Sequence, residues 1–348
     1  MYGLALEGGG AKGSYEIGAY IALLELGYKF NMVTGTSIGS LNAALIVQGD
    51  IRLARKLWLN SDSEIIGIDK DIVETIKKFK LNKENIKDSL KEIKKIINNK
   101  GLNVSNYKNM IDKYVNESKV RKSKINYGLV TVRLKDMKPL ELTISDIEEG
   151  KLSEYILASS YLPVFKMDKI IDNSFYLDGA FSDNLPINLL EKNGCKNIIA
   201  IRIDGIGRIK KKINDDTNII ELKSTKNTGP IIMFDNNDVK NNFYMGYYDT
   251  YLKFKKIDGF KYYFKKFKFY KFITRKVDDK KLSLVKLRFR TSDLKDVVIK
   301  SIESILENNN IYYYKVYSIP KIIKYIKKNK LKSKELLINE FVYSLKIL

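Results

Sequence analysis

Residues 30–49 read FNMVTGTSIGSLNAALIVQG, and this stretch sets the architecture of the N-terminal part of the chain. Phe30–Thr34 is a short apolar run that predicts a buried strand, and Ile38–Gln48 has the apolar spacing of a helix. Between them, one glycine stands two residues before Ser37 and another two residues after it. A serine on such a tight strand-to-helix turn is typical of an exposed nucleophile. The alternative is that Ser37 only caps the helix.

The chain contains no histidine, so an imidazole cannot activate Ser37. A serine hydroxyl is a weak nucleophile until a base accepts its proton, and the remaining candidate bases are Asp, Glu, Lys and Tyr. Asp178 stands out because it follows the strand-like run Phe175–Leu177 and precedes Gly179 and Ala180. Strand ends of a parallel sheet share one edge, so we expect Asp178 beside Ser37. The alternative is an ordinary Asp-Gly turn.

A glycine-rich loop, GGGAKG at residues 8–13, follows the predicted strand Tyr2–Leu6 and opens the predicted helix Ser14–Leu26. Its spacing matches the turn of dinucleotide-binding folds, which also place an acidic residue about 20 positions further on, at the end of the second strand. Glu25 is near that count but lies within the helix. The other use of such a loop is to hold a developing oxyanion with backbone N–H groups at a helix N-terminus.

Strand and helix patterns alternate through residues 1–205, which predicts a mostly parallel sheet covered by helices. The lysine-rich residues 71–98 interrupt this pattern and predict a helical insert or lid. Residues 206–348 are predicted to be a basic C-terminal extension, in which an exposed connection precedes helices at 236–256, 294–308 and 319–347. The later strands are predicted at Tyr127–Val132, Leu140–Thr143, Ser174–Leu177 and Asn197–Ile203, with a helix at Lys151–Ser159.

The positive charge of the chain is concentrated towards its C-terminus. The net charge is +22, and residues 201–348 hold 34 of the 63 Lys and Arg but only 16 of the 41 Asp and Glu. Between residues 260 and 275, eight aromatic residues are interleaved with lysines. This pattern fits an anionic partner such as a membrane or nucleic acid. It fits equally well a compositional bias towards lysine, with the aromatics in a core and the lysines on a solvated face.

Cysteine usage and hydropathy indicate the compartment. The single cysteine, Cys195, allows no intrachain disulfide and is compatible with a reducing compartment. The sequence shows no cleavable signal peptide and no uncharged apolar run of the ~20 residues that span a bilayer. We therefore expect a cytoplasmic or peripheral membrane protein.

Taken together, these blocks resemble the patatin-like phospholipases, which use a Ser–Asp dyad without histidine. The order of the blocks across residues 3–205 is the order found in that family. Ala158–Pro163 and Asn184-Leu185-Pro186 are similar to two further family segments, whereas Lys12 stands where many members have Arg and Ala180 where many have Gly. The resemblance implies Ser37 as nucleophile, Asp178 as base, an oxyanion hole at Gly8, Gly9, Gly10 and Ala11, and support from Lys12, Gly13, Gly35, Gly39 and Gly179.

The resemblance further implies a three-layer α/β/α fold and hydrolysis of fatty acyl esters of phospholipids, without a metal or other cofactor. The expected partners are an acyl-lipid substrate and an anionic membrane surface contacted by the basic C-terminal part, while nucleic acid is not an expected partner. Two other functions stay open at this point: a nucleotide-binding oxidoreductase that uses Gly8–Gly13, and a non-catalytic module that binds membrane or nucleic acid. The sequence leaves open the lipid headgroup, the sn position and the oligomeric state.

Overall fold

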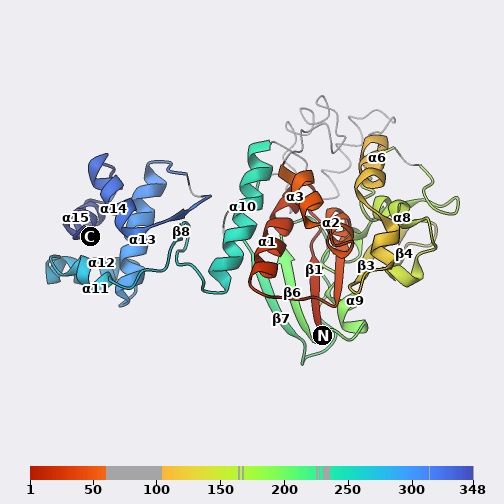
Figure 1. The fold of residues 1–348 in the computed structure, drawn as a ribbon, viewed down its shortest axis with the longest axis horizontal. Coiled ribbons are helices and arrows are strands. Elements are labelled where there is room, and N and C mark those ends of the chain that lie inside the picture. The colour runs from red at the N-terminus through yellow and green to blue at the C-terminus, as the bar shows by residue number, and fades with distance from the viewer. Residues whose placement is uncertain are drawn as a thin grey trace. The chain divides into compact units, whose positions relative to one another are not determined.

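A computed structural model describes residues 1–59, 104–163, 165–166, 168–224, 226, 228–229, 236–312 and 314–347. The chain forms two compact units, Met1–Asp249 and Thr250–Leu348, and the boundary falls within the long helix α10 (Asn236–Lys253). Figure 1 shows both units with their helices and strands labelled. The predicted insert at residues 71–98 lies outside the described residues.

The described residues of the first unit build a seven-stranded sheet with the strand order β4-β3-β2-β1-β6-β7, and β5 pairs with β3. All neighbouring pairs are parallel except β3 with β4 and β3 with β5, so the predicted mostly parallel α/β sheet is confirmed. The strands are β1 (Tyr2–Leu6), β2 (Met32–Thr36), β3 (Asn126–Arg133), β4 (Lys138–Thr143), β5 (Tyr176–Asp178), β6 (Asn197–Arg202) and β7 (Asn218–Lys223).

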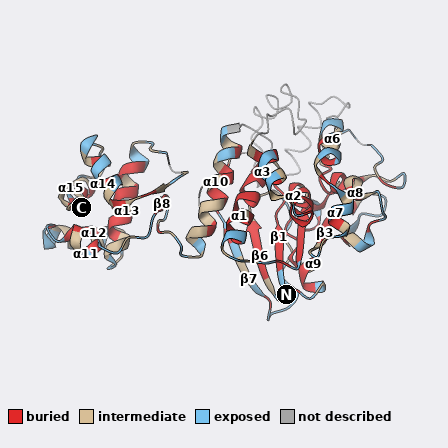
Figure 2. Ribbon diagram, in the orientation of Figure 1, coloured by how far each residue is buried: buried red, intermediate tan, exposed pale blue. Residues whose placement is uncertain are grey.

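Helices cover the sheet because its central strands are apolar on both faces. Ala5 and Met32 pack with Leu190 of α9 in one buried cluster, whereas Leu4 and Leu6 point the other way, since side chains alternate along a strand. Figure 2 shows how thoroughly the central strands and α2 are buried. Besides α10, the helices are α1 (Gly13–Glu25), α2 (Ile38–Val47), α3 (Ile51–Leu59), α6 (Ser105–Tyr114), α7 (Glu117–Arg121), α8 (Leu152–Ser159) and α9 (Ile187–Lys192), with short 3₁₀ turns η1 (Gly10–Lys12), η3 (Ile144–Asp146) and η4 (Gly179–Phe181).

The first unit continues beyond residue 205, where the sequence pattern changes. The segment predicted as an exposed connection contains β7, which pairs in parallel with β6 from Asn197↔Asn218 to Arg202↔Lys223. Sequence patterns missed this strand because it is the edge of the sheet and only Leu222 in it is buried. Its sequence, NIIELK, lacks the strict alternation of apolar and polar residues that marks a half-buried strand.

The second unit is helical and has a hydrophobic core of its own. Its elements are α11 (Tyr270–Thr274), α12 (Asp279–Phe289), α13 (Leu294–Asn308), α14 (Ile319–Lys328) and α15 (Leu336–Ser344), with the two-residue strands β8 (Tyr263–Phe264) and β9 (Val316–Tyr317). The predicted helix 319–347 is therefore two helices, separated by a turn after Lys328. Of the interleaved aromatics, Tyr262, Tyr263, Phe264 and Tyr270 are buried in the unit, whereas Phe260 and Phe269 are exposed. The core interpretation thus holds for much of this segment.

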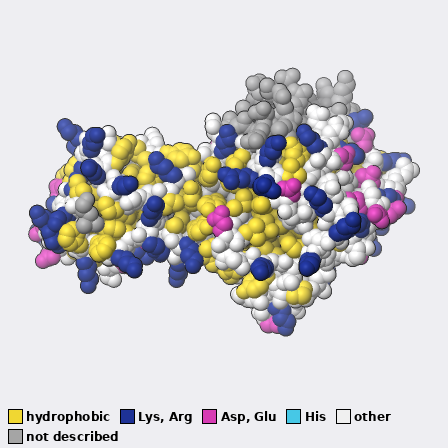
Figure 3. All heavy atoms as spheres, in the orientation of Figure 1, with side chains coloured by type: hydrophobic (Ala, Val, Ile, Leu, Met, Phe, Trp, Pro, Cys, Tyr) yellow, Lys and Arg dark blue, Asp and Glu magenta, His cyan; other side chains and the backbone are white. Residues whose placement is uncertain are grey.

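The second unit also differs from the first in its charge. Residues 250–348 contain 26 Lys and Arg against nine Asp and Glu, which leaves this unit strongly positive. Figure 3 shows many basic and few acidic side chains on the visible face of this unit. No helix within the described residues is long and apolar enough to cross a membrane.

Candidate active site

Ser37 lies on a strained turn that joins β2 directly to α2. Its backbone has φ 55° and ψ −127°, a conformation that is costly for a residue with a side chain and that concentrates at functional sites. The turn is so tight that a Cβ on Gly35 would lie 2.1 Å from the carbonyl oxygen of Gly39. A Cβ on Gly39 would in turn lie 2.7 Å from the carbonyl oxygen of Leu6. Both glycines are therefore required by the geometry of the turn.

The backbone of Ser37 is fixed from both sides by hydrogen bonds that do not use its hydroxyl. The Ser37 N–H donates to Ser159 Oγ (2.9 Å), and the Ser159 hydroxyl donates in turn to the carbonyl oxygen of Val130 (2.7 Å). The Ser40 hydroxyl donates to the Ser37 carbonyl oxygen (2.6 Å). Ser37 occupies the N-cap position of α2, as the alternative interpretation expects, but its side chain makes no capping hydrogen bond to the helix.

Asp178 lies beside Ser37 as predicted, but the strand that carries it runs in the direction opposite to the predicted one. The prediction placed Asp178 at the end of a parallel strand, but β5 runs antiparallel to β3. Thr36, the last residue of β2, pairs with Val130 of β3, and Asp178, the last residue of β5, pairs with the next residue, Thr131. Two strands thus arrive from opposite directions along one edge of β3, and their ends bring Ser37 and Asp178 together.

The carboxyl group of Asp178 is buried beside the Ser37 hydroxyl. Only 1% of Asp178 is exposed, and burial raises its pKa from 3.8 to about 6, against hydrogen bonds from the Ala180 N–H and the Ser37 hydroxyl that lower it. The bond from the Ala180 N–H measures 2.8 Å, so the Asp-Gly turn exists as well. No Lys or Arg of the described residues forms an ion pair with this carboxylate. It therefore remains a stronger base than an exposed aspartate.

The glycine loop lies against the Ser37 turn. A Cβ on Gly8 would lie 3.0 Å from both the Ser37 Cβ and the Thr36 carbonyl oxygen, so only a glycine permits this approach. Among the described residues, the backbone N–H groups of Gly9, Gly10 and Ala11 have no acceptor. The loop thus presents N–H groups close to the serine, at the start of α1, where the helix dipole favours negative charge.

Asn184 clamps the glycine loop in place. The Gly8 N–H donates to the Asn184 carbonyl oxygen (3.1 Å), and the Asn184 side-chain amide donates to the Gly8 carbonyl oxygen (3.0 Å). The N–H of Gly8, expected in the oxyanion hole, is therefore occupied within the fold. The loop after β6 adds support, because Lys12 Nζ donates to the Asp204 carbonyl oxygen (3.1 Å).

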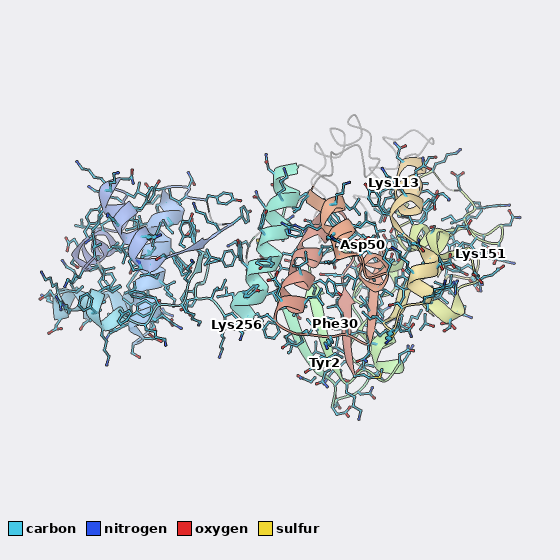
Figure 4. The ribbon with its side chains drawn as sticks, viewed as in Figure 1. Tyr2, Phe30, Asp50, Lys113, Lys151 and Lys256 are labelled. Carbon is cyan, nitrogen blue, oxygen red and sulfur yellow. The ribbon has the colours of Figure 1, made fainter. Side chains whose placement is uncertain are left out.

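Gly13 and Gly179 act as spacers at the edges of the site. A Cβ on Gly179 would lie 2.2 Å from the carbonyl oxygen of Val130, which would separate the Asp178 turn from β3. A Cβ on Gly13 would lie 2.9 Å from side-chain atoms of Ile38 and Trp58. All residues named from the sequence are thus brought to one place at the carboxyl ends of β1 and β2. Figure 4 labels Tyr2 and Phe30, which mark the opposite end of the sheet.

Sequence reasoning missed several residues that shape the site. Tyr107 on α6 forms a hydrogen bond with Ser160 Oγ (3.0 Å); burial raises its pKa, and the nearby Asp178 carboxylate raises it further. The Ser159–Ser160 pair thus links both Ser37 and Tyr107 to α8. Tyr107 carries no local sequence signal, because its helix follows a region of no clear pattern and its role depends on distant partners.

Comparison with known proteins identifies the class of protein. A family model of the patatin-like phospholipases matches residues 4–190, more than half of the chain, and the chain belongs to this family. Membership implies a lipid ester hydrolase. It also argues against the oxidoreductase interpretation, as does the lack of an acidic residue at the end of β2.

Individual relatives are distant. Patatin-like phospholipase domain-containing protein 7 of Rattus norvegicus is 26% identical over 211 residues, which cover 58% of this chain and 13% of that protein. Patatin-like phospholipase domain-containing protein 6 of Homo sapiens is 24% identical over 208 residues, with the same two coverages. The aligned region thus spans about an eighth of the length of these relatives.

Two solved structures align with this chain at low similarity. The crystal structure of VipD from Legionella pneumophila has 14% sequence identity and a TM-score of 0.41, and the alignment covers 94% of this chain and 79% of that one. The type III effector protein ExoU has 13% identity and a TM-score of 0.34, with 98% and 70% coverage.

Proposed function

We propose that this protein cleaves fatty acyl esters of phospholipids in a phospholipase A-type reaction, with Ser37 as nucleophile and Asp178 as base. The observation that carries the proposal is the hydrogen bond between the Ser37 hydroxyl and a buried carboxylate whose pKa is raised to about 6. A base with a pKa near the working pH accepts a proton effectively while it remains mostly ionised.

In the first half-reaction, Asp178 accepts the Ser37 proton as Ser37 Oγ attacks the ester carbonyl carbon. The carbonyl oxygen of the ester becomes an oxyanion, which the N–H groups of Gly9, Gly10 and Ala11 stabilise; one such donor is worth about 2.7–4 kcal/mol. Collapse of this intermediate breaks the bond to the lysolipid oxygen, which leaves with the proton from Asp178. The product on the protein is an ester of Ser37.

In the second half-reaction, Asp178 accepts a proton from water as the water oxygen attacks the acyl-Ser37 carbonyl. The same N–H groups hold the second oxyanion. Its collapse releases the fatty acid and returns the proton to Ser37 Oγ. One base thus serves both steps, which is consistent with a chain that has no histidine.

An apolar side chain beside the site favours a lipid substrate. Phe181 follows the Asp178 turn within η4 and is 43% exposed, although it is a large hydrophobic residue. Phe181 is therefore a candidate contact for an acyl chain bound near Ser37.

We also propose that the basic second unit contacts an anionic membrane. Its excess of positive charge suits attraction to anionic lipid headgroups. Nucleic acid is a weaker candidate, because Tyr262, Phe264 and Tyr270 are buried in the core and cannot stack on bases.

The proposed reaction is tested by incubating the full chain with a mixed lipid extract and identifying the products by mass spectrometry. We expect free fatty acid and lysophospholipid from the wild type and neither product from Ser37→Ala or Asp178→Asn. Ser118→Ala is the matched control, because it removes an exposed hydroxyl on α7 that the proposed reaction does not use. Full fatty-acid release by a folded Ser37→Ala or Asp178→Asn variant would refute the dyad. Release of neutral-lipid acyl chains alone would refute the phospholipid substrate.

A further inference from the structure

Three leucines of the second unit are exposed on two helices that pack against each other. Leu284 and Leu287 on α12 are 45% and 74% exposed, and Leu336, the first residue of α15, is 72% exposed. Leu284 and Leu287 are three residues apart and therefore lie on one face of α12. Scattered exposed leucines are ordinary, but a group of three on adjoining helices is not. We call these three residues the leucine patch.

Ion pairs hold the two helices of the leucine patch together. Arg288 donates two hydrogen bonds to the Glu335 carboxylate, Nε to Oε2 (2.7 Å) and Nη2 to Oε1 (2.8 Å). Lys281 Nζ lies 3.1 Å from Glu340 Oε2. The end of α12 is thus joined to the start of α15, and the start of α12 to the middle of α15, so the helices are antiparallel. Leu284 and Leu287 lie between the two bridges along α12.

The two helices that carry the leucine patch are fixed by core residues on their buried faces. Val285 of α12, together with Ile338 and Phe341 of α15, is fully buried in the core of the second unit. The helices therefore cannot rotate to bury the leucines without exposing these core residues. Their exposure is a consequence of the fold.

Exposed positive charges without a described carboxylate partner flank the leucine patch along the chain. Lys280 lies one turn before Leu284, Arg290 caps the end of α12, and Lys334 precedes Leu336 by two residues. None of these three cations forms an ion pair with a described carboxylate. Arg288 and Lys281, by contrast, are paired with carboxylates and join the two helices. Lys280, Arg290 and Lys334 face solvent.

We propose that the leucine patch inserts into the interface of an anionic lipid bilayer, while Lys280, Arg290 and Lys334 contact lipid phosphates. The proposal rests on the membrane contact proposed above and specifies its surface, but it is independent of the chemistry at Ser37. Apolar side chains rimmed by cations match a bilayer, in which anionic headgroups border an apolar interior. A nucleic acid would use the cations but would have no use for three aliphatic side chains.

The test is co-sedimentation of the full chain with vesicles, in a Ser37→Ala background so that lipid composition stays constant. Vesicles of neutral phosphatidylcholine are compared with vesicles that contain about 30% phosphatidylserine, which gives them the negative surface potential of an anionic leaflet. We expect Leu284→Ser/Leu287→Ser/Leu336→Ser to weaken binding to the anionic vesicles at least about tenfold. Circular dichroism and thermal unfolding establish that this variant is folded.

A pair of charge variants separates a specific surface from general attraction. Lys280→Gln/Arg290→Gln/Lys334→Gln removes three charges at the leucine patch, and Lys321→Gln/Lys324→Gln/Lys328→Gln removes three exposed charges from α14. We expect the first variant to bind anionic vesicles at least about fivefold more weakly than the second. Equal losses in both, with no loss in the leucine variant, would overturn the proposal.

Two further readouts keep the outcome unambiguous. If the leucine patch joins two copies of the chain, sedimentation velocity will show a dimer that the leucine variant abolishes without a change in vesicle binding, and the proposal is then wrong. In the active background, the leucine variant should hydrolyse a soluble short-chain ester at the wild-type rate. If the wild type cleaves no ester at all, the catalytic proposal fails while the vesicle result still stands.

Discussion

The two turns that meet at the candidate site are built in different ways. The Ser37 turn is local: a strand, a strained residue and a helix follow one another within residues 32–47, and the flanking glycines are dictated by backbone contacts inside that segment or with β1. The Asp178 turn depends on distant residues, because β5 occupies the edge of β3 that β2 leaves free when it turns at Ser37. A local motif is thus completed by a partner that only the sheet can position.

The electrostatic character of the two turns also differs. Ser37 is held by neutral hydrogen bonds to its backbone, whereas Asp178 is a buried carboxylate with a raised pKa. Burial of that charge destabilises the fold while it makes the base stronger. The Asp178 turn therefore combines a cost in stability with a gain in proposed reactivity, and the variants below test this difference.

The largest expected effect is the loss of activity when either Ser37 or Asp178 is replaced, because the two residues are proposed to act together. Ser37→Ala and Asp178→Asn should each lower kcat/KM by at least about 10⁴-fold, because neither group works without the other. The kcat/KM of the double variant, measured with a soluble ester, should be no lower than that of the more damaging single variant. Multiplicative losses in the double variant would show that the two residues act separately.

The next effect is on stability at the Asp178 turn. The pKa of Asp178 is raised from 3.8 to about 6 in the fold, so the folded state binds a proton more tightly than the unfolded state does. Its destabilising contribution is therefore absent below about pH 4, grows as pH rises to about 6, and is complete above that, at about 3 kcal/mol. Asp178→Asn should raise the free energy of unfolding at pH 7.5 by up to this amount and make no difference at pH 4, as measured by urea titration.

A matched control for that experiment is Asp136→Asn. Arg133 holds the pKa of the exposed Asp136 carboxyl down at about 2, which is a shift of the opposite sign. Its removal should therefore not stabilise the protein at neutral pH. An equal gain in the free energy of unfolding from both variants would mean that the loss of any negative charge stabilises this chain.

The pH profile of hydrolysis should report the same carboxylate. Since Asp178 must be ionised to accept the Ser37 proton, kcat/KM for a soluble ester should fall about 30-fold from pH 7.5 to 4.5, with its midpoint near the pKa of about 6. Circular dichroism across this range checks that the fold persists. A midpoint near 4 would show that a different, exposed group controls the rate.

The smallest expected effect is at the backbone support of Ser37. Ser159→Ala leaves the Ser37 N–H without its 2.9 Å partner, which should cost about 1–2 kcal/mol and lower kcat about tenfold. Ser160→Ala is the control, because Ser160 bonds Tyr107 rather than Ser37. We expect kcat of that variant to stay within about threefold of the wild-type value; a larger loss than in Ser159→Ala would reverse the assignment of the two serines.

Much of the fold follows from short-range patterns. The patterns predict Tyr2–Leu6, Ile38–Gln48 and residues 294–308 within one or two residues of the observed elements, because strong apolar periodicity and a closing glycine or capping side chain mark them. They miss the edge strand β7 and the break between α14 and α15, since β7 lacks strict alternation of apolar and polar residues and a lysine-rich turn resembles a helix surface in sequence. Such local patterns do not predict how the helices and strands pack against one another.

For the site, the local pattern around Ser37 predicts its turn, in which Gly35 is required by a contact with Gly39 four residues on and Gly39 by the approach of β1. The sequence also excluded an imidazole base and marked Asp178 as a candidate. The direction of the strand that carries Asp178, the glycine-loop N–H groups that remain available, and the support from Ser159, Asn184 and Tyr107 all follow from long-range packing. These depend on pairing and hydrogen bonding between residues up to about 180 positions apart, and no local pattern encodes a contact over that separation.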